Sequence, residues 1–334
     1  MNGITTPPGG SHDAPAGNAS ASWSRRAIWM RLLLYPTHTL PTAAAPVLVA
    51  VGLAVRDHVF APGAVALAFL GSWLIHIAGV FFDNHELLRK HGEVLEHPEL
   101  LQALRGGTLT LRALRWAILA CLAGSVLAGV WLVATGGTLA VMLGVIGVAA
   151  SLSYAGGPLA YARRGLAEPI FFLMFGVVAI AGTYFIQSAA LHGPPPPGLP
   201  EAVLALPVDV FFVGLPVGAL ITNVLIIDDM RDVAFDAAKG WRTGAVRFGI
   251  AWSRVRHVLL YVFAYLAPPV FYFFSDRRAS LLLPLLTLPW AWSIVRTVCT
   301  RTGAEALGPM TPRASMLSLG YAFFLAIGIA ISAR

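Results

Sequence analysis

Apolar runs long enough to cross a bilayer recur along almost the whole chain, and they constrain the fold more than any other feature. A helix that spans the hydrocarbon core needs about 20 predominantly apolar residues. Of the 334 residues, 57% are hydrophobic and 12% are charged, and the mean hydropathy is +0.74. A soluble domain cannot bury that much apolar surface, which excludes a soluble enzyme, a nucleic-acid-binding module and a disordered chain. We therefore predict an all-α, polytopic membrane protein with about nine transmembrane helices. The nine runs lie at 32–55, 61–82, 113–134, 137–155, 166–190, 203–227, 255–274, 279–299 and 314–333.

The N-terminal segment lacks this pattern. Residues 1–24 are rich in Gly, Pro, Ser and Ala and carry almost no charge, which is typical of a disordered tail rather than a signal peptide. We predict such a tail over 1–24 and a single transmembrane domain over 25–334. Pro36, Pro41 and Pro46 interrupt the first apolar run and predict a kinked helix there.

The positions of the basic residues predict the orientation in the membrane. Lys and Arg are enriched in cytoplasmic loops. Most of the 23 Lys and Arg residues flank the N-terminus or fall in the loops after the even-numbered runs. We therefore expect an integral protein of a bacterial inner membrane, with its N-terminus and its long loops 83–112 and 228–254 on the cytoplasmic side. The net charge of +7 then reflects these loops and implies no nucleic-acid partner.

A cluster of four aspartates, at positions 228, 229, 232 and 236, follows the sixth run. Spacings of three and four residues place such side chains on one face of a helix, where like charges repel. A bound cation relieves this repulsion, and Mg²⁺ prefers oxygen ligands and often bridges to substrate phosphates. Lys239 and Arg242 follow directly and could contact those phosphates. The alternative is a solvated charge run at the membrane surface, with Arg231 as a local partner.

A weaker polar cluster ends the second run, in the stretch FFDNHELLRKHG. Asp83 and Glu86 lie one helical turn apart, with Asn84 between them and Arg89 and Lys90 after them. An ordinary polar helix end is the alternative explanation of this cluster.

Three stretches together resemble one family. They are THTLPTAAAPVLVAVG at 37–52, SYAGGPLAYARRGLAEPIFFLMFGVVAIAGTYFIQ at 153–187, and the aspartate-rich stretch 228–249 with its trailing Gly240 and Thr243. The chain resembles the intramembrane prenyltransferases of the UbiA superfamily, most closely the branch that prenylates 1,4-dihydroxy-2-naphthoate in menaquinone synthesis. The resemblance covers most of the chain from about residue 30.

The resemblance implies nine helices around a central cavity and two aspartate motifs that bind an isoprenyl diphosphate through Mg²⁺. The implied reaction transfers a prenyl group from a polyprenyl diphosphate to a small aromatic or quinone-precursor acceptor, within the lipid bilayer. The expected metal ligands are Asp83, Glu86, Asp228, Asp229, Asp232 and Asp236, of which Asp83, Asp232 and Asp236 are the expected catalytic residues. Lys239, Arg242, Arg89 and Lys90 are expected to bind diphosphate, and Asn84, Tyr154 and Tyr184 to line the substrate cavity.

The first motif departs from the family pattern, Asn-Asp-x-x-Asp. Gly79 and Val80 occupy its first two positions, Asp83 keeps the last, and Glu86 offers a displaced carboxylate. This departure leaves other hypotheses open: a membrane terpene cyclase that uses the same diphosphate without an acceptor, a changed acceptor, or a catalytically inactive paralogue. A transporter is a further alternative, although its site would usually lie near the middle of the bilayer.

Overall fold

The computed structural model describes residues 24–34, 39–90, 98–156, 159–193, 203–275 and 277–332. Every regular element in these ranges is helical, which confirms the predicted all-α class. The predicted tail at 1–24 lies outside the described residues, except for Ser24.

Seven helical segments are long and apolar enough to cross a membrane. They include α3 (Pro62–Lys90), α5 (Leu111–Ala155), α6 with η2 and α7 (Ala167–Leu173, Met174–Val178, Ala179–His192), α9 with α10 (Asp209–Phe212, Leu215–Arg231), α12 (Gly244–Phe274), η3 with α13 (Ala279–Thr287, Leu288–Thr300) and α14 with α15 (Ala304–Leu307, Met310–Ile331). The apolar stretch Leu40–Arg56 within α2 (Thr39–Arg56) is shorter.

The first predicted run does not form one helix. Its residues are divided between α1 (Arg25–Leu34) and α2, and residues 35–38 between them lie outside the described chain. Pro46 lies within α2, so this proline is accommodated inside a helix. The described residues of the predicted run thus belong to two helices, and the part of the prediction that concerns Pro36 lies outside the described residues.

The long α5 consists of two helical halves joined at Gly137. This residue has φ 58° and ψ −144°, a conformation that glycine adopts without steric cost. Gly124 in the first half lies against Leu74 of α3, while Ser151 in the second half donates a hydrogen bond to the carbonyl of Ile75 (2.8 Å). Adjacent α3 residues thus contact both halves, so the chain reverses at Gly137.

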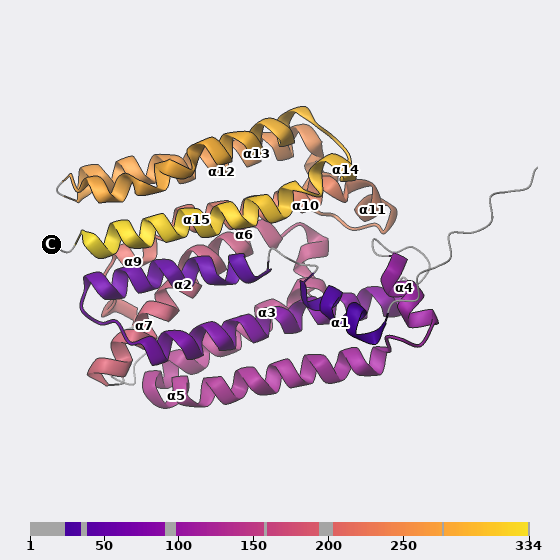
Figure 1. Ribbon diagram of the computed structural model, residues 1–334, viewed down its shortest axis with the longest axis horizontal. Helices are drawn as coiled ribbons and strands as arrows, with labels where there is room; N and C mark the ends of the chain where they lie inside the picture. The colour runs from indigo at the N-terminus through magenta and orange to yellow at the C-terminus, as the bar shows by residue number, and fades with distance from the viewer. Residues whose placement is uncertain are drawn as a thin grey trace, which may run out of the picture.

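The helices form an elongated bundle in which α10 is central (Figure 1). The main hydrophobic core joins α2, α10, α12 and α15, and a second core packs α1 and α4 (Pro98–Arg105) against α3 and the start of α5. The carboxyl ends of α3 and α10 lie at the same end of the bundle as α4 and α11 (Val233–Ala238). This arrangement brings the two acidic clusters of the sequence together.

Candidate functional site

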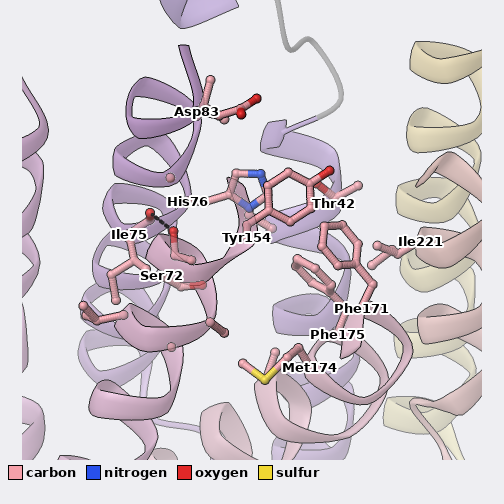
Figure 2. A pocket seen from close by; sticks show the side chains of 18 of the residues that line it. Thr42, Ser72, Ile75, His76, Asp83, Tyr154, Phe171, Met174, Phe175 and Ile221 are labelled. Atoms are coloured by element: carbon pink, nitrogen blue, oxygen red, sulfur yellow. Dashed lines mark hydrogen bonds between the residues drawn. The ribbon is translucent and has the colours of Figure 1, made fainter. Parts of the chain in front are cut away.

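A cavity of about 1560 Å³ lies among α3, α5, α6, η2 and α10, and acidic side chains line one end of it. Figure 2 shows Asp83 above a group of aromatic rings, with Met174 farther from the carboxylate. Five predicted metal ligands line this cavity together, namely Asp83, Asp228, Asp229, Asp232 and Asp236.

The end of α10 positions two of these carboxylates beside a guanidinium group. The helix ends at Arg231, and Asp232 follows with non-helical backbone angles. Arg231 lies 2.6 Å from Asp228 through Nη1 and donates from Nε to Asp232 (2.7 Å). Thr311 of α15 also donates a hydrogen bond to Asp228 (2.6 Å). Arg231 is therefore a local partner of the cluster, as the alternative interpretation of the sequence expected, and it also lines the cavity.

A short turn between α11 and α12 holds the carboxylates of Asp229 and Asp236. The Thr243 hydroxyl donates to Asp236 (3.0 Å), and the Gly244 backbone N–H donates to Asp229 (3.1 Å). Burial raises the pKa of Asp236 to about 6, with a further contribution from the negative charge of Asp232 and opposition from the Thr243 hydrogen bond. A cation bound beside Asp236 would favour its ionised form.

Asp83 reaches the cavity from the opposite wall, on α3. Its nearest cation is Arg163 in η1 (Tyr161–Arg164), with Nη2 3.8 Å from Oδ1 of Asp83. The Arg163 guanidinium also lies 4.6 Å from the centre of the Trp241 ring, a cation–π distance that fixes its position. Asn84 lines the cavity too, and its side-chain amide donates to the carbonyl of Val80 (2.9 Å).

Glu86, expected as a metal ligand, is not among the residues that line the cavity. Its carboxylate is buried and accepts two hydrogen bonds from Arg89, at 3.0 and 2.9 Å. His85 lies 3.4 Å from the same carboxylate and accepts a hydrogen bond from Arg115 of α5 (3.0 Å). Glu86 thus belongs to a contact between α3 and α5, and Asp83 is the carboxylate that the first cluster brings to the cavity.

The expected diphosphate-binding cations lie elsewhere. Arg242 is exposed, and Lys239 lies 5.8 Å from the centre of the Phe235 ring. Arg89 is bonded to Glu86, and the side chain of Lys90 lies outside the described part of the structure. Among the described residues, the arginines that line the cavity are Arg163 and Arg231. The sequence analysis did not identify Arg163 as a site residue, although the stretch 153–187, which resembles the family, contains it.

Aromatic side chains line the cavity beyond the carboxylates. Tyr154 packs against Phe171 with ring centres 5.6 Å apart, and Phe171 packs against Phe175 at 5.2 Å (Figure 2). His76 approaches Phe175 at 6.2 Å. Tyr184, also expected here, instead lies in the main core and donates a hydrogen bond to Asp57 (2.8 Å) at the other end of the bundle. Tyr154 thus joins this aromatic wall and Tyr184 does not.

The donor set suits a hard divalent cation that is shared with a ligand. In the described residues, no group of three His, Cys, Asp or Glu side chains is arranged to hold a metal ion by itself. Mg²⁺ often binds through one or two carboxylates, keeps several waters and completes its shell with substrate phosphates. Carboxylates spread around one end of a cavity fit that mode better than an enclosed protein site.

Comparison with known proteins identifies the family of the chain and agrees with its fold. The model of the UbiA prenyltransferase family matches residues 43–306. The 1,4-dihydroxy-2-naphthoate octaprenyltransferase of Escherichia coli is 27% identical over 92% of this chain and 97% of its own length. The protein of that name from Mycobacterium tuberculosis is 28% identical over 88% of this chain and 79% of its own length.

A solved structure shows the same fold at lower identity. The apo structure of a UbiA homologue from Aeropyrum pernix superposes with a TM-score of 0.63 at 16% identity, covering 89% of this chain and 97% of that one. The family match spans more than half of the chain, includes Asp83, Arg163 and the aspartates of α10 and α11, and agrees with the resemblance found in the sequence. The chain belongs to the UbiA prenyltransferase family and is a prenyltransferase enzyme of the membrane.

Proposed function

We propose that the protein transfers a prenyl group from a polyprenyl diphosphate to 1,4-dihydroxy-2-naphthoate, with Mg²⁺ as cofactor. The observation that supports this most strongly is the meeting of Asp83 with the four aspartates of residues 228–236 at one end of an aromatic-lined cavity. A diphosphate needs cations, and a prenyl chain needs an apolar volume. One cavity offers sites for both.

Mg²⁺ would be held by one or two of the carboxylates of Asp229, Asp232 and Asp236 together with the substrate phosphates, and Asp228 and Asp83 lie in the same cavity lining. When bound there, it would neutralise the charge that develops on the departing diphosphate. Thr243 and Thr311 orient two of these carboxylates through hydrogen bonds, and such support of a ligand raises its affinity for the metal.

Arg163 and Arg231 are the residues that we assign to the phosphate oxygens. Guanidinium groups bind phosphate through two parallel hydrogen bonds. Nη2 of Arg163 is buried and has no hydrogen-bond acceptor among the described residues, so it can donate to a ligand. Arg231 contacts both Asp228 and Asp232, so it is placed to bind a diphosphate whose metal ion is held by these carboxylates. Lys239 and Arg242 do not line the cavity and would reach the diphosphate only if their turn moved toward it.

The aromatic wall suits the reacting carbon. Loss of diphosphate leaves positive charge on an allylic carbon, and the faces of aromatic rings attract such charge. Tyr154 and Phe171 line the same cavity as the carboxylates, and the apolar lining excludes water that would otherwise consume the cation. The choice of acceptor rests on the relatives named above, which are named as 1,4-dihydroxy-2-naphthoate octaprenyltransferases.

We also propose nine membrane crossings, with the acidic end of the cavity at the cytoplasmic side of a bacterial inner membrane. The seven helices reach nine when α2 is included and α5 is counted as two crossings that meet at Gly137. Arg163, Arg164, Arg242 and Arg247 lie near the acidic end, in agreement with the enrichment of basic residues in cytoplasmic loops.

The test uses the full-length protein in lipid nanodiscs with radiolabelled geranylgeranyl diphosphate, Mg²⁺ and 1,4-dihydroxy-2-naphthoate. We expect a prenylated naphthoate that forms only when both Mg²⁺ and the acceptor are present. A hydrocarbon or terpene alcohol formed without acceptor would instead establish the cyclase alternative. Absence of diphosphate release with any acceptor or chain length would contradict the proposed reaction.

A further inference from the structure

A buried ion pair lies directly behind the turn that holds two of the cavity carboxylates. Glu168, in the first turn of α6, is bonded to Arg256 of α12, and both side chains are largely buried, at 16% and 19% exposed. Arg256 also donates a hydrogen bond to Ser253 (3.0 Å). Neither Glu168 nor Arg256 is among the residues that line the cavity, so the pair cannot act on the substrate by contact.

Gly244 lies in close contact with this pair. A methyl group built on Gly244 would lie 2.2 Å from Oε1 of Glu168 and 2.8 Å from Nη2 of Arg256, so a larger residue there would displace the ends of these two side chains. The backbone N–H of Gly244 is the group that donates to Asp229, and the neighbouring Thr243 donates to Asp236. The position of the ion pair therefore sets the position of two hydrogen-bond donors, each of which orients one carboxylate.

The same turn also orients the cavity arginine. The backbone N–H of Arg242 donates to the carbonyl of Arg163 (2.8 Å), and the Trp241 ring lies beneath the Arg163 guanidinium. The residues 241–244 thus join the segment 163–168 at two places, at Arg163 and at Glu168. We call residues 163–168, residues 241–244 and Arg256 the clasp.

We propose that the Glu168–Arg256 pair is a positioning pair for prenyl transfer, which holds the clasp so that Asp229, Asp236 and Arg163 are placed together for a metal-bound diphosphate. This proposal rests on the proposed function. Both oxygens of the Glu168 carboxylate accept from Nη1 of Arg256, a charged contact that a neutral partner does not reproduce. Loss of the pair should therefore loosen the metal ligands without removing any of them.

The test compares Glu168→Gln with Asp57→Asn in purified, full-length protein. Both variants replace a carboxylate by its amide in an arginine pair, but Asp57 pairs with Arg56 at the opposite end of the bundle, far from the clasp. The measurement is the rise in melting temperature that Mg²⁺ gives in the presence of geranylgeranyl thiodiphosphate, an unreactive donor analogue, as a function of Mg²⁺ concentration. We expect Glu168→Gln to raise the half-saturating Mg²⁺ concentration about tenfold or more, and Asp57→Asn to leave it at the wild-type value.

The outcomes separate this inference from the proposed function. Equal Mg²⁺ dependence in Glu168→Gln and wild type would overturn the positioning role while leaving the reaction intact. If the wild type showed no stabilisation by Mg²⁺ and the analogue, both proposals would fail. Should Glu168→Gln not accumulate, Arg256→Lys provides the same test, because it keeps the charge and removes the planar fork. A wild-type half-saturating concentration in that variant would likewise overturn the inference.

Discussion

The two ends of the helix bundle both carry charged residues, but they balance them differently. At the end remote from the cavity carboxylates, Arg56 pairs with Asp57 and Asp209, and Tyr184 donates to Asp57. Burial alone would raise the pKa of Asp57, but the hydrogen bonds from Arg56 and Tyr184 hold it below its ordinary value. Both carboxylates of this network are paired with Arg56.

At the acidic end, five carboxylates and two guanidinium groups line one cavity. Negative charge therefore exceeds positive charge in a space of low dielectric, where such an excess is unfavourable unless a cation joins it. The comparison teaches that one arginine contacts both carboxylates at one end, whereas at the other end the proposed Mg²⁺ would balance carboxylates that the two cavity arginines do not. Substitutions at the two ends should accordingly change different properties.

The largest effect is expected from Asp236→Ala or Asp232→Ala. Each removes one of the carboxylates proposed to hold Mg²⁺. We expect turnover to fall by roughly a hundredfold or more, as it does when other preorganised electrostatic groups are removed. Steady-state prenyl transfer in nanodiscs measures the loss, and the amount of protein in the membrane fraction shows that the variants still insert. Full activity of either variant would mean that the metal assignment is wrong.

Arg163→Gln should have the next largest effect. It removes a charged hydrogen-bond donor to phosphate, a change of about 2 kcal/mol, or roughly thirtyfold in the KM for the diphosphate. Lys239→Ala is the matched control, since Lys239 does not line the cavity, and its KM should stay within about twofold of wild type. A large rise in KM for Lys239→Ala and an unchanged KM for Arg163→Gln would instead assign phosphate binding to Lys239, as predicted from the sequence alone.

Asp83→Ala should have a smaller effect on turnover, of about tenfold. Asp83 is a single carboxylate on the α3 wall, because Glu86 is bonded to Arg89 instead of facing the cavity. The comparison of kcat for Asp83→Ala and Asp232→Ala under identical conditions tests this ranking. Equal losses would show that the first motif contributes as much as the second despite its changed residues.

Tyr184→Phe should have the smallest effect on catalysis. It removes one hydrogen bond from the network of Arg56, Asp57 and Asp209, which costs about 1 kcal/mol of stability and leaves kcat and KM unchanged. Because the folded protein lowers the pKa of Asp57, its stabilising contribution is full above the ordinary Asp pKa of about 4 and is lost as the pH falls below it. Thermal denaturation of variant and wild type measures the first effect, and its pH dependence measures the second. A fall in kcat would instead place Tyr184 in the reaction.

The parts of the site that are local in sequence could be predicted. Asp228, Asp232 and Asp236 recur at helical spacing, but they do not share one helix, because α10 ends at Arg231 and Asp236 lies in α11; all three still line the cavity. Asp83 stands in the polar cluster that ends the second apolar run, and the resemblance fixed its register. Glu86 lies only one turn away from Asp83, yet it does not line the cavity, because Arg89 on the same helix binds its carboxylate.

The cations could not be predicted by proximity in sequence. Lys239 and Arg242 follow the aspartates directly, but the chain turns between α11 and α12 and carries them away from the cavity. Arg163 is 65 or more residues from that cluster in sequence and reaches it through the contact of its carbonyl with Arg242. Tyr184 lies in the family-like segment, but α7 carries it past the cavity toward Asp57.

The sequence by itself determined the membrane environment, the helical class, the family and the cluster of aspartates, because apolar run length, helical period and motif spacing are local properties of a chain. Tertiary structure decided which arginines join those aspartates, that Glu86 is withdrawn, and that Glu168 and Arg256 support the turn behind them. These are contacts between helices distant in sequence. They depend on where the chain reverses, at Gly137 and at the Thr243–Gly244 turn, and on which face each helix then presents to its neighbours.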